Sequence, residues 1–256
     1  MIDYAFWAVA IFAVFIVGLS KSGLVGAIGM VGVPLLSLVM PARDATGMML
    51  PVLLAMDAIA IWIYRRDANW QVLAILLPGA AVGTLLGWAL WSVVTDAEVL
   101  LAVGIITILF MLDALIPLRK RLAEGTPPSR PWGVFWGAAA GLTSFISHTG
   151  APPYQIYTLP MKMSPVLFSG TTAFFFAIVN AMKLVPFYFL GQLNVANLEL
   201  SAVLIPVGLL GVAVGVFLVR RISAKAFYQI AYFFILVLGI KLTWDGINGV
   251  FFSPVG

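Results

Sequence analysis

The stretch Pro34-Leu35-Leu36-Ser37-Leu38-Val39-Met40-Pro41 has a counterpart 119 residues later, Pro153-Tyr154-Gln155-Ile156-Tyr157-Thr158-Leu159-Pro160, and both copies begin and end with proline. Further pairs follow at spacings of 123 and 128: Gly47 and Asp57 match Gly170 and Asn180, and Gly83 and Gly87 match Gly211 and Gly215. Small loop insertions would produce such a drift in spacing. Two related hydrophobic halves are typical of secondary transporters whose halves have opposed topology and meet at the substrate site.

The composition predicts an all-α polytopic membrane protein. The chain has 256 residues, of which 62% are hydrophobic and 9% charged, whereas a soluble domain is about 45–50% apolar and about 25% charged. Most of its apolar segments are long enough to cross a hydrocarbon core of about 30 Å. They cover 4–20, 22–40, 46–63, 72–91, 97–116, 132–147, 149–161, 166–190, 198–219 and 226–245.

The basic segment 117–131 divides the chain into a first transmembrane repeat, 1–116, and a second, 132–256. Because basic loops stay in the cytoplasm, we expect this linker there. Counting segments then places three further basic groups on the same side: Arg65 with Arg66, Arg220 with Arg221, and Lys225. Loops 92–96 and 191–197 have no Lys or Arg and are expected outside. The second repeat is therefore expected to be inverted, with both termini extracytoplasmic and the protein multi-pass in the cell inner membrane. No signal peptide is expected at the N-terminus.

The first two segments of each half either cross the membrane or form a re-entrant hairpin. Residues 149–160 include Pro152 and Pro153 and would extend only about 18 Å as a helix. This length favours the hairpin, whose irregular tip is tolerated only where protein buries it or where it lines a cavity.

The two hairpin tips combine glycines, hydroxyls and one ionisable side chain within apolar surroundings. They are Gly18-Leu19-Ser20-Lys21-Ser22-Gly23 and Gly141-Leu142-Thr143-Ser144-Phe145-Ile146-Ser147-His148-Thr149-Gly150. Helix N-termini and hydroxyls at such tips suit a small oxyanion. The candidate anion ligands are Ser20, Lys21, Ser22, Ser147, His148, Thr149 and Gly150. The alternative for Lys21 is an anchor at the membrane interface.

Lys183 lies within a hydrophobic segment and shares a helix face with Asn180. Since ionisable residues inside a membrane are costly and usually functional, we expect this pair to bind the anion. The alternative is a lysine that extends to the interface. Asp57 is expected to neutralise Lys183 between substrates or to carry a coupling proton, or else to form a structural ion pair.

Further candidates follow from single residues. His148 is the only histidine; it could couple transport to protons or simply be hydrogen-bonded at an interface, and it cannot belong to a multi-histidine metal site. Thr171 and Thr172 are expected to begin a helix after Gly170, where their hydroxyls could cap the helix or hold an anion. Tyr154 is a weaker candidate near another predicted helix start.

Motifs in both halves resemble one known family. Gly26-Ala27-Ile28-Gly29-Met30-Val31-Gly32-Val33-Pro34-Leu35-Leu36 and His148-Thr149-Gly150-Ala151-Pro152-Pro153-Tyr154 resemble the paired motifs of the TauE/SafE family. Later stretches resemble its second half: Gly170-Thr171-Thr172, Asn180-Ala181-Met182-Lys183 and Phe187-Tyr188. The resemblance covers about 5–245, although Ala27, Ile28, Met30 and Val31 replace the fuller glycine run of many relatives. It implies transport of sulfite, organosulfonates or related oxyanions.

These observations together predict a secondary transporter of a small anion that works by alternating access. Its expected partners are the anion, the lipid bilayer and another copy of the chain, if it oligomerises. No nucleic-acid binding, no prosthetic group and no enzymatic activity are expected, and the absence of cysteine excludes disulfides and thiolate metal sites. The alternatives are an anion channel with two re-entrant hairpins, an intramembrane enzyme and a membrane scaffold.

Overall fold

The structure is a computed structural model, and it describes residues 4–22, 29, 32–36, 38–93, 95, 97, 98, 101, 104, 105, 108 and 129–252. The basic linker, most of the predicted segment 97–116 and most of the first glycine-rich motif lie outside these residues. In the described part every regular element is helical, as the composition predicts.

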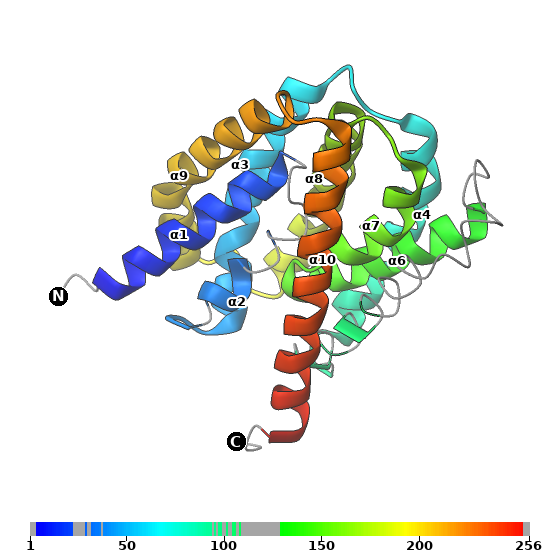
Figure 1. Cartoon of the computed structure of the whole chain (residues 1–256). Helices are drawn as coiled ribbons and strands as arrows, with labels where there is room; N and C mark the ends of the chain where they lie inside the picture. Colours follow the sequence, from blue (N-terminus) through cyan, green and yellow to red (C-terminus); the bar gives the residue numbers. More distant parts are fainter. Residues whose placement is uncertain are drawn as a thin grey trace.

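The helices are of two kinds, long rods and short pieces (Figure 1). They are α1 (Tyr4–Lys21), α2 (Gly32–Leu36), α3 (Ala42–Tyr64), α4 (Trp70–Leu90), α6 (Arg130–Ser147), α7 (Ala151–Thr158), α8 (Pro165–Phe189), α9 (Val195–Val219) and α10 (Ala224–Ile247). A 3-10 turn, Leu159–Met161, continues α7, and a π turn, Asn248–Phe252, follows α10. Within the described residues, five helices are long and apolar enough to cross a membrane: α1, α3, α4, α8 and α9. The protein is thus an all-helical, multi-pass membrane protein.

The closest helix packing joins elements that are far apart in the chain. α1 packs along α9, and α4 packs along α6. A Cβ atom on Gly18 would meet the backbone carbonyl of Gly208, and one on Gly83 would meet that of Ala138. Glycine at these positions lets the helix backbones approach closely. The glycines that mark the repeat in the sequence therefore lie at helix crossings.

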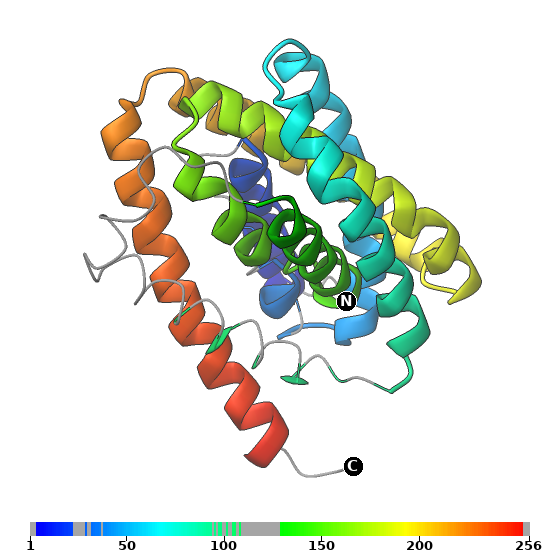
Figure 2. The ribbon, with the colours of Figure 1, turned by 90° about the vertical axis from the view of Figure 1, so that its right-hand side faces the viewer.

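α3 and α8 lie against each other in the middle of this arrangement. α3 also contacts α9, and α8 also contacts α4. Figure 2 shows α4 along one side of the molecule and α10 along the other. Glycines in the first two turns of α3 and α8 behave alike: a Cβ on Gly47 would meet the carbonyl of Gln192, and one on Gly170 would meet the carbonyl of Asp67. The start of each central helix thus abuts the loop that follows the other central helix.

The turn between α6 and α7 places polar residues inside the protein. α6 ends at His148, whose φ of 55° is left-handed, and α7 begins directly after Gly150. α7 has eight residues, about 12 Å as a helix, and all eight are buried. The short second element predicted for 149–161 is confirmed, and its counterpart α2 has only five residues.

Two of the basic groups expected on one side of the membrane lie together. Arg65 and Arg66 follow α3 and Arg220 follows α9, and all three line one hollow of about 280 Å³. In Figure 1 both connections are at the top of the molecule. The hollow also contains Trp62, whose ring centroid is 5.6 Å from the Arg65 guanidinium carbon.

Candidate functional site

A cavity of about 60 Å³ lies where α1, α3, α6, α7 and α8 meet. A water needs roughly 10–15 Å³ of such space, so the cavity has room for a few waters or one small ion. Apolar side chains, including Met49 and Phe176, form much of its wall. Its polar lining residues are Ser20, Lys21, Ser144, His148, Thr172 and Asn180.

Asp57 on α3 connects a helix of the first half to a helix of the second. Lys21 Nζ at the end of α1 lies 2.6 Å from Asp57 Oδ1, and Asn180 Nδ2 on α8 donates to Asp57 Oδ2 at 2.6 Å. Only 11% of the Lys21 side chain and 2% of the Asp57 side chain are exposed. Both carboxylate oxygens of Asp57 thus accept from donors. The two equivalent positions of the sequence repeat are thus in direct contact.

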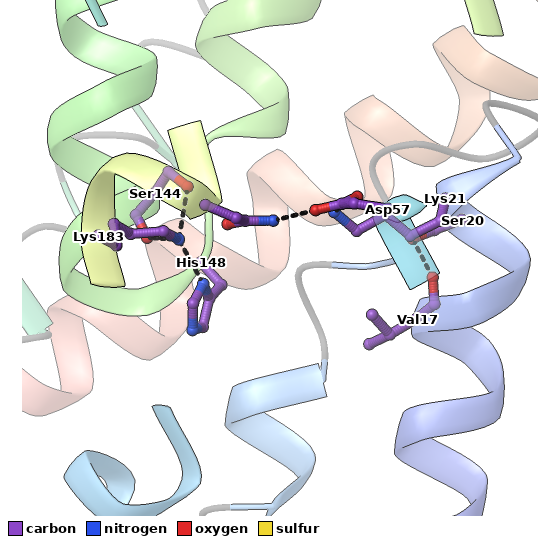
Figure 3. Close-up of polar contacts among 8 residues, drawn as sticks. Val17, Ser20, Lys21, Asp57, Ser144, His148 and Lys183 are labelled. Carbon is purple, nitrogen blue, oxygen red and sulfur yellow. Dashed lines mark hydrogen bonds and ion pairs between the residues drawn. The ribbon is translucent and has the colours of Figure 1, made fainter. Parts of the chain in front are cut away.

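Lys183, one turn beyond Asn180 on α8, has a different set of partners (Figure 3). Its Nζ lies 3.0 Å from the Ser144 carbonyl oxygen, 3.1 Å from Ser144 Oγ and 2.8 Å from His148 Nδ1. The side chain is fully buried. Among the residues that the structure describes, no carboxylate forms an ion pair with it.

His148 links this group to the start of α3, because its Nε2 lies 3.1 Å from the carbonyl oxygen of Thr46. A carbonyl oxygen only accepts hydrogen bonds, so Nε2 carries the proton. Nδ1 then accepts from the Lys183 ammonium. The imidazole is therefore neutral with both nitrogens occupied, and protonating it requires Lys183 to turn away.

The expected pairing of Asp57 with Lys183 is wrong, because Lys21 and Asn180 occupy both oxygens of that carboxylate. Lys183 turns toward α6 and lies behind Ser144 and His148 rather than lining the cavity. The interface interpretation of Lys183 is also wrong, since the side chain is buried. Lys21 is likewise no exposed anchor, since it lines the cavity and pairs with Asp57.

The expected helix start at Thr171 and Thr172 is wrong as well. α8 begins at Pro165, with Ser164 as its N-cap accepting from Leu167 N, because proline is favoured in the first turn of a helix. The two threonines lie more than a turn inside, and their hydroxyls donate to the carbonyls four residues earlier at 2.7 and 2.8 Å. Thr172 still lines the cavity and lies 3.1 Å from the Tyr154 hydroxyl. Thr171 instead accepts from the backbone N–H of Asn69.

Most remaining candidates are engaged locally. Ser20 and Ser22 donate to the carbonyls of Val17 and Leu19, both at 2.7 Å. The hydroxyls of Ser147 and Thr149 bond each other at 2.9 Å, and a Cβ on Gly150 would crowd the Ala140 carbonyl at 2.6 Å. Two of these predicted ligands, Ser20 and Thr172, line the cavity. The others do not: Ser22, Ser147, Thr149, Gly150, Thr171 and Tyr154.

Sequence reasoning missed two groups of this site, Ser144 and the Thr46 carbonyl. Ser144 was within the predicted tip but was not chosen as a ligand. A signal existed, because Ser144 stands 123 residues after Lys21, the same spacing that relates Asp57 to Asn180. The Thr46 contact left no trace in the sequence, because any residue type supplies a backbone carbonyl.

The polar groups of the site are mainly hydrogen-bond donors. In the described part of the chain, no cluster of three His, Cys, Asp or Glu side chains could hold a metal ion. The groups that face the cavity are an ammonium, an amide, hydroxyls and a neutral imidazole, which are hydrogen-bond donors suited to an oxyanion.

Long apolar helices surround a small cavity lined by both apolar and polar side chains, as in a multi-pass membrane protein. The family model described as Sulfite exporter TauE/SafE matches residues 10–242, so the chain belongs to the TauE/SafE family. This is a family of membrane transporters, which agrees with the expectation of a non-enzymatic role. Comparisons with curated proteins and with solved structures found no match.

Proposed function

We propose that this protein is a secondary transporter of a small oxyanion, sulfite or an organosulfonate, and that the anion binds in the cavity beside Lys21 and His148. The observation that carries the proposal is the buried ammonium of Lys183. Asp57 is already paired with Lys21, so a protonated Lys183 would leave one positive charge in excess near the cavity.

A buried ammonium without an opposite charge costs several kcal/mol even on permissive membrane scales. Its three acceptors, the Ser144 carbonyl, the Ser144 hydroxyl and His148 Nδ1, satisfy its hydrogens but supply no negative charge. An anion in the adjacent cavity would supply it. This reasoning favours an anion over a neutral or cationic substrate.

The lining residues have distinct roles in this proposal. Lys21 and Asn180 contribute donors that they share with Asp57. His148 lines the cavity and is hydrogen-bonded to Lys183, so it connects the lysine to the cavity wall. Its ring lies between the ammonium and the Thr46 carbonyl. Asp57 or His148 would carry a coupling proton if transport is driven by protons. No bond of the substrate is broken.

Alternating access is supported by the reciprocal packing of the two halves. α1 on α9 and α6 on α4 are equivalent contacts with the roles of the halves exchanged. The cavity lies where the halves meet, as in inverted-repeat transporters. We place α6–α7 and α1–α2 as re-entrant hairpins and the arginine-lined end in the cytoplasm. An inside-negative potential would then push an anion outward, which favours export.

The test is uptake and counterflow of labelled sulfite in proteoliposomes. A transporter saturates and accelerates labelled uptake when unlabelled sulfite is inside, whereas a channel with two re-entrant hairpins shows no counterflow. Lys183→Met should lose saturable sulfite uptake while remaining folded. Lys241→Met is the matched control, because that lysine is half exposed and pairs with Asp245 at the end of α10. Normal uptake by folded Lys183→Met would contradict the proposed anion site.

A further inference from the structure

We infer that the site selects anions that carry a single negative charge, and that Asp57 sets this preference. The inference rests on the proposed function, because it concerns the same cavity. It follows from the charges that surround the cavity.

Among the described residues, four lysine, aspartate or histidine side chains belong to the cavity or contact its lining directly: Lys21, Asp57, His148 and Lys183. Lys21 and Asp57 cancel, as an ion pair with both carboxylate oxygens bonded. His148 is neutral, because its Nε2–H faces a carbonyl and its Nδ1 faces an ammonium. With an anion bound, Lys183 is protonated, and the protein contributes one net positive charge.

The segment that follows α1 adds no ionisable side chain to these four. Residues 23–28, 30 and 31 are Gly, Leu, Val, Gly, Ala, Ile, Met and Val, none of which is ionisable. Within the described residues, the other lining side chains are apolar or neutral. The net charge around the anion is therefore set by Lys183 alone, as long as Asp57 balances Lys21.

A net charge matters here because apolar side chains form much of the cavity wall. Val17, Val33, Leu53 and Phe176 help to wall the cavity, and an apolar environment strengthens electrostatic interactions while penalising an unbalanced charge. A monoanion makes the loaded site neutral. A dianion leaves one negative charge in excess and should bind more weakly, even if it has the same size.

Methanesulfonate and sulfate are suitable probes, since both are tetrahedral at sulfur and a methyl group in one replaces a charged oxygen in the other. Titration calorimetry on the purified full chain in detergent measures the dissociation constant of each. We expect methanesulfonate to bind at least ten-fold more tightly than sulfate. Equal or tighter binding of sulfate by the wild type would overturn the inference by itself, whether or not any variant folds.

Asp57→Asn should raise the net charge of the site to two and shift the affinity ratio at least ten-fold toward sulfate. The asparagine oxygen still accepts from Lys21, and Asn180 can turn its amide to accept from the new amide group. The double variant Lys21→Met with Asp57→Asn restores a net charge of one, so it should regain the wild-type ratio even if both affinities fall. Asp67→Asn is the matched control, because it removes a carboxyl beyond the end of α3. The ratio of its affinities for methanesulfonate and sulfate should stay unchanged.

The outcomes separate the two proposals. If both anions bind and folded Asp57→Asn keeps the wild-type ratio, charge selection by Asp57 is wrong while the anion site stands. If the wild type binds neither probe but takes up labelled sulfite in a saturable way, the selection of monoanions is wrong and the sulfite site stands. If it binds neither probe and takes up no sulfite, both proposals fail.

Discussion

Removing Lys21 alone should destabilise the protein more than removing both charges of its ion pair. In Lys21→Met, the Asp57 carboxylate would stay buried, with a side chain 2% exposed and the amide of Asn180 as its one remaining hydrogen-bond donor. Breaking a buried ion pair from one side costs about 3–5 kcal/mol, because the other charge is left without a partner, whereas replacing both partners by neutral groups is often close to neutral.

Thermal unfolding of the detergent-solubilised protein measures this difference. A domain of this size loses about 2–4 °C in Tm per kcal/mol, so Lys21→Met should lower Tm by about 6–20 °C. The double variant Lys21→Met with Asp57→Asn should recover most of that loss.

Lys241→Met is again the control. Its partner Asp245 is 29% exposed and the lysine 50% exposed, and an exposed pair of this spacing is worth only about 0.3–0.5 kcal/mol. If Lys21→Met unfolds at the same temperature as the double variant, the ion pair does not hold α1 to α3 in the way argued above, and the reasoning from burial is refuted.

Three further predictions use other parts of the molecule. The chain has no cysteine, so a single introduced cysteine can be labelled without background. Gln192→Cys should react with an impermeant reagent from outside, whereas Arg66→Cys and Ser223→Cys should react only after the membrane is disrupted. Labelling of Gln192→Cys and Ser223→Cys from the same side would exclude the inverted topology. Gly83→Ala should cost about 1–3 kcal/mol of stability, because its Cβ would meet the Ala138 carbonyl. The control Val82→Ala, on the exposed face of α4, should change Tm little. Similar Tm values for the two variants would contradict the close helix contact. His148→Ala should lower the transport rate and change its dependence on pH, with normal membrane insertion, because it removes a hydrogen-bond partner of the buried Lys183. An unchanged rate and pH profile in a folded variant would leave His148 only a packing role.

Much of the architecture could be predicted from the sequence because it depends on local properties of the chain. Apolar length predicts spanning helices, and a run of twelve residues with three prolines predicts the short α7. The spacing of 123 identified Asp57 and Asn180 as equivalent positions, and the structure places them in contact at 2.6 Å. Two residues of the predicted polar tip from 141 to 150, Ser144 and His148, line the cavity.

The wrong predictions for Lys183, Thr171 and Thr172 share one physical cause, which is that local patterns do not fix how a helix is placed against its neighbours. Helical periodicity shows that Asn180 and Lys183 share a face, but a turn of helix separates them, and each can face a different neighbour. The rotation of α8 against α3 and α6 directs Asn180 to Asp57 and Lys183 to Ser144. The start of α8 at Pro165 removed Thr171 and Thr172 from the helix end, because the serine and proline there make a stronger N-terminus than the glycine before the threonines.

By itself, the sequence determined the class of the protein, its family and the kinds of residue available for an anion, because hydrophobic length, composition and motif spacing are properties of the chain alone. Only the tertiary structure decided which charges cancel. Lys21 reaches Asp57 across 36 residues, and Lys183 is left with neutral partners 35 and 39 residues away. Such pairings depend on how helices rotate and cross when they pack. In a strongly hydrophobic sequence the helices are apolar on nearly every face, so the sequence of one helix does not show which face is buried. The contacts of the whole fold decide the rotation.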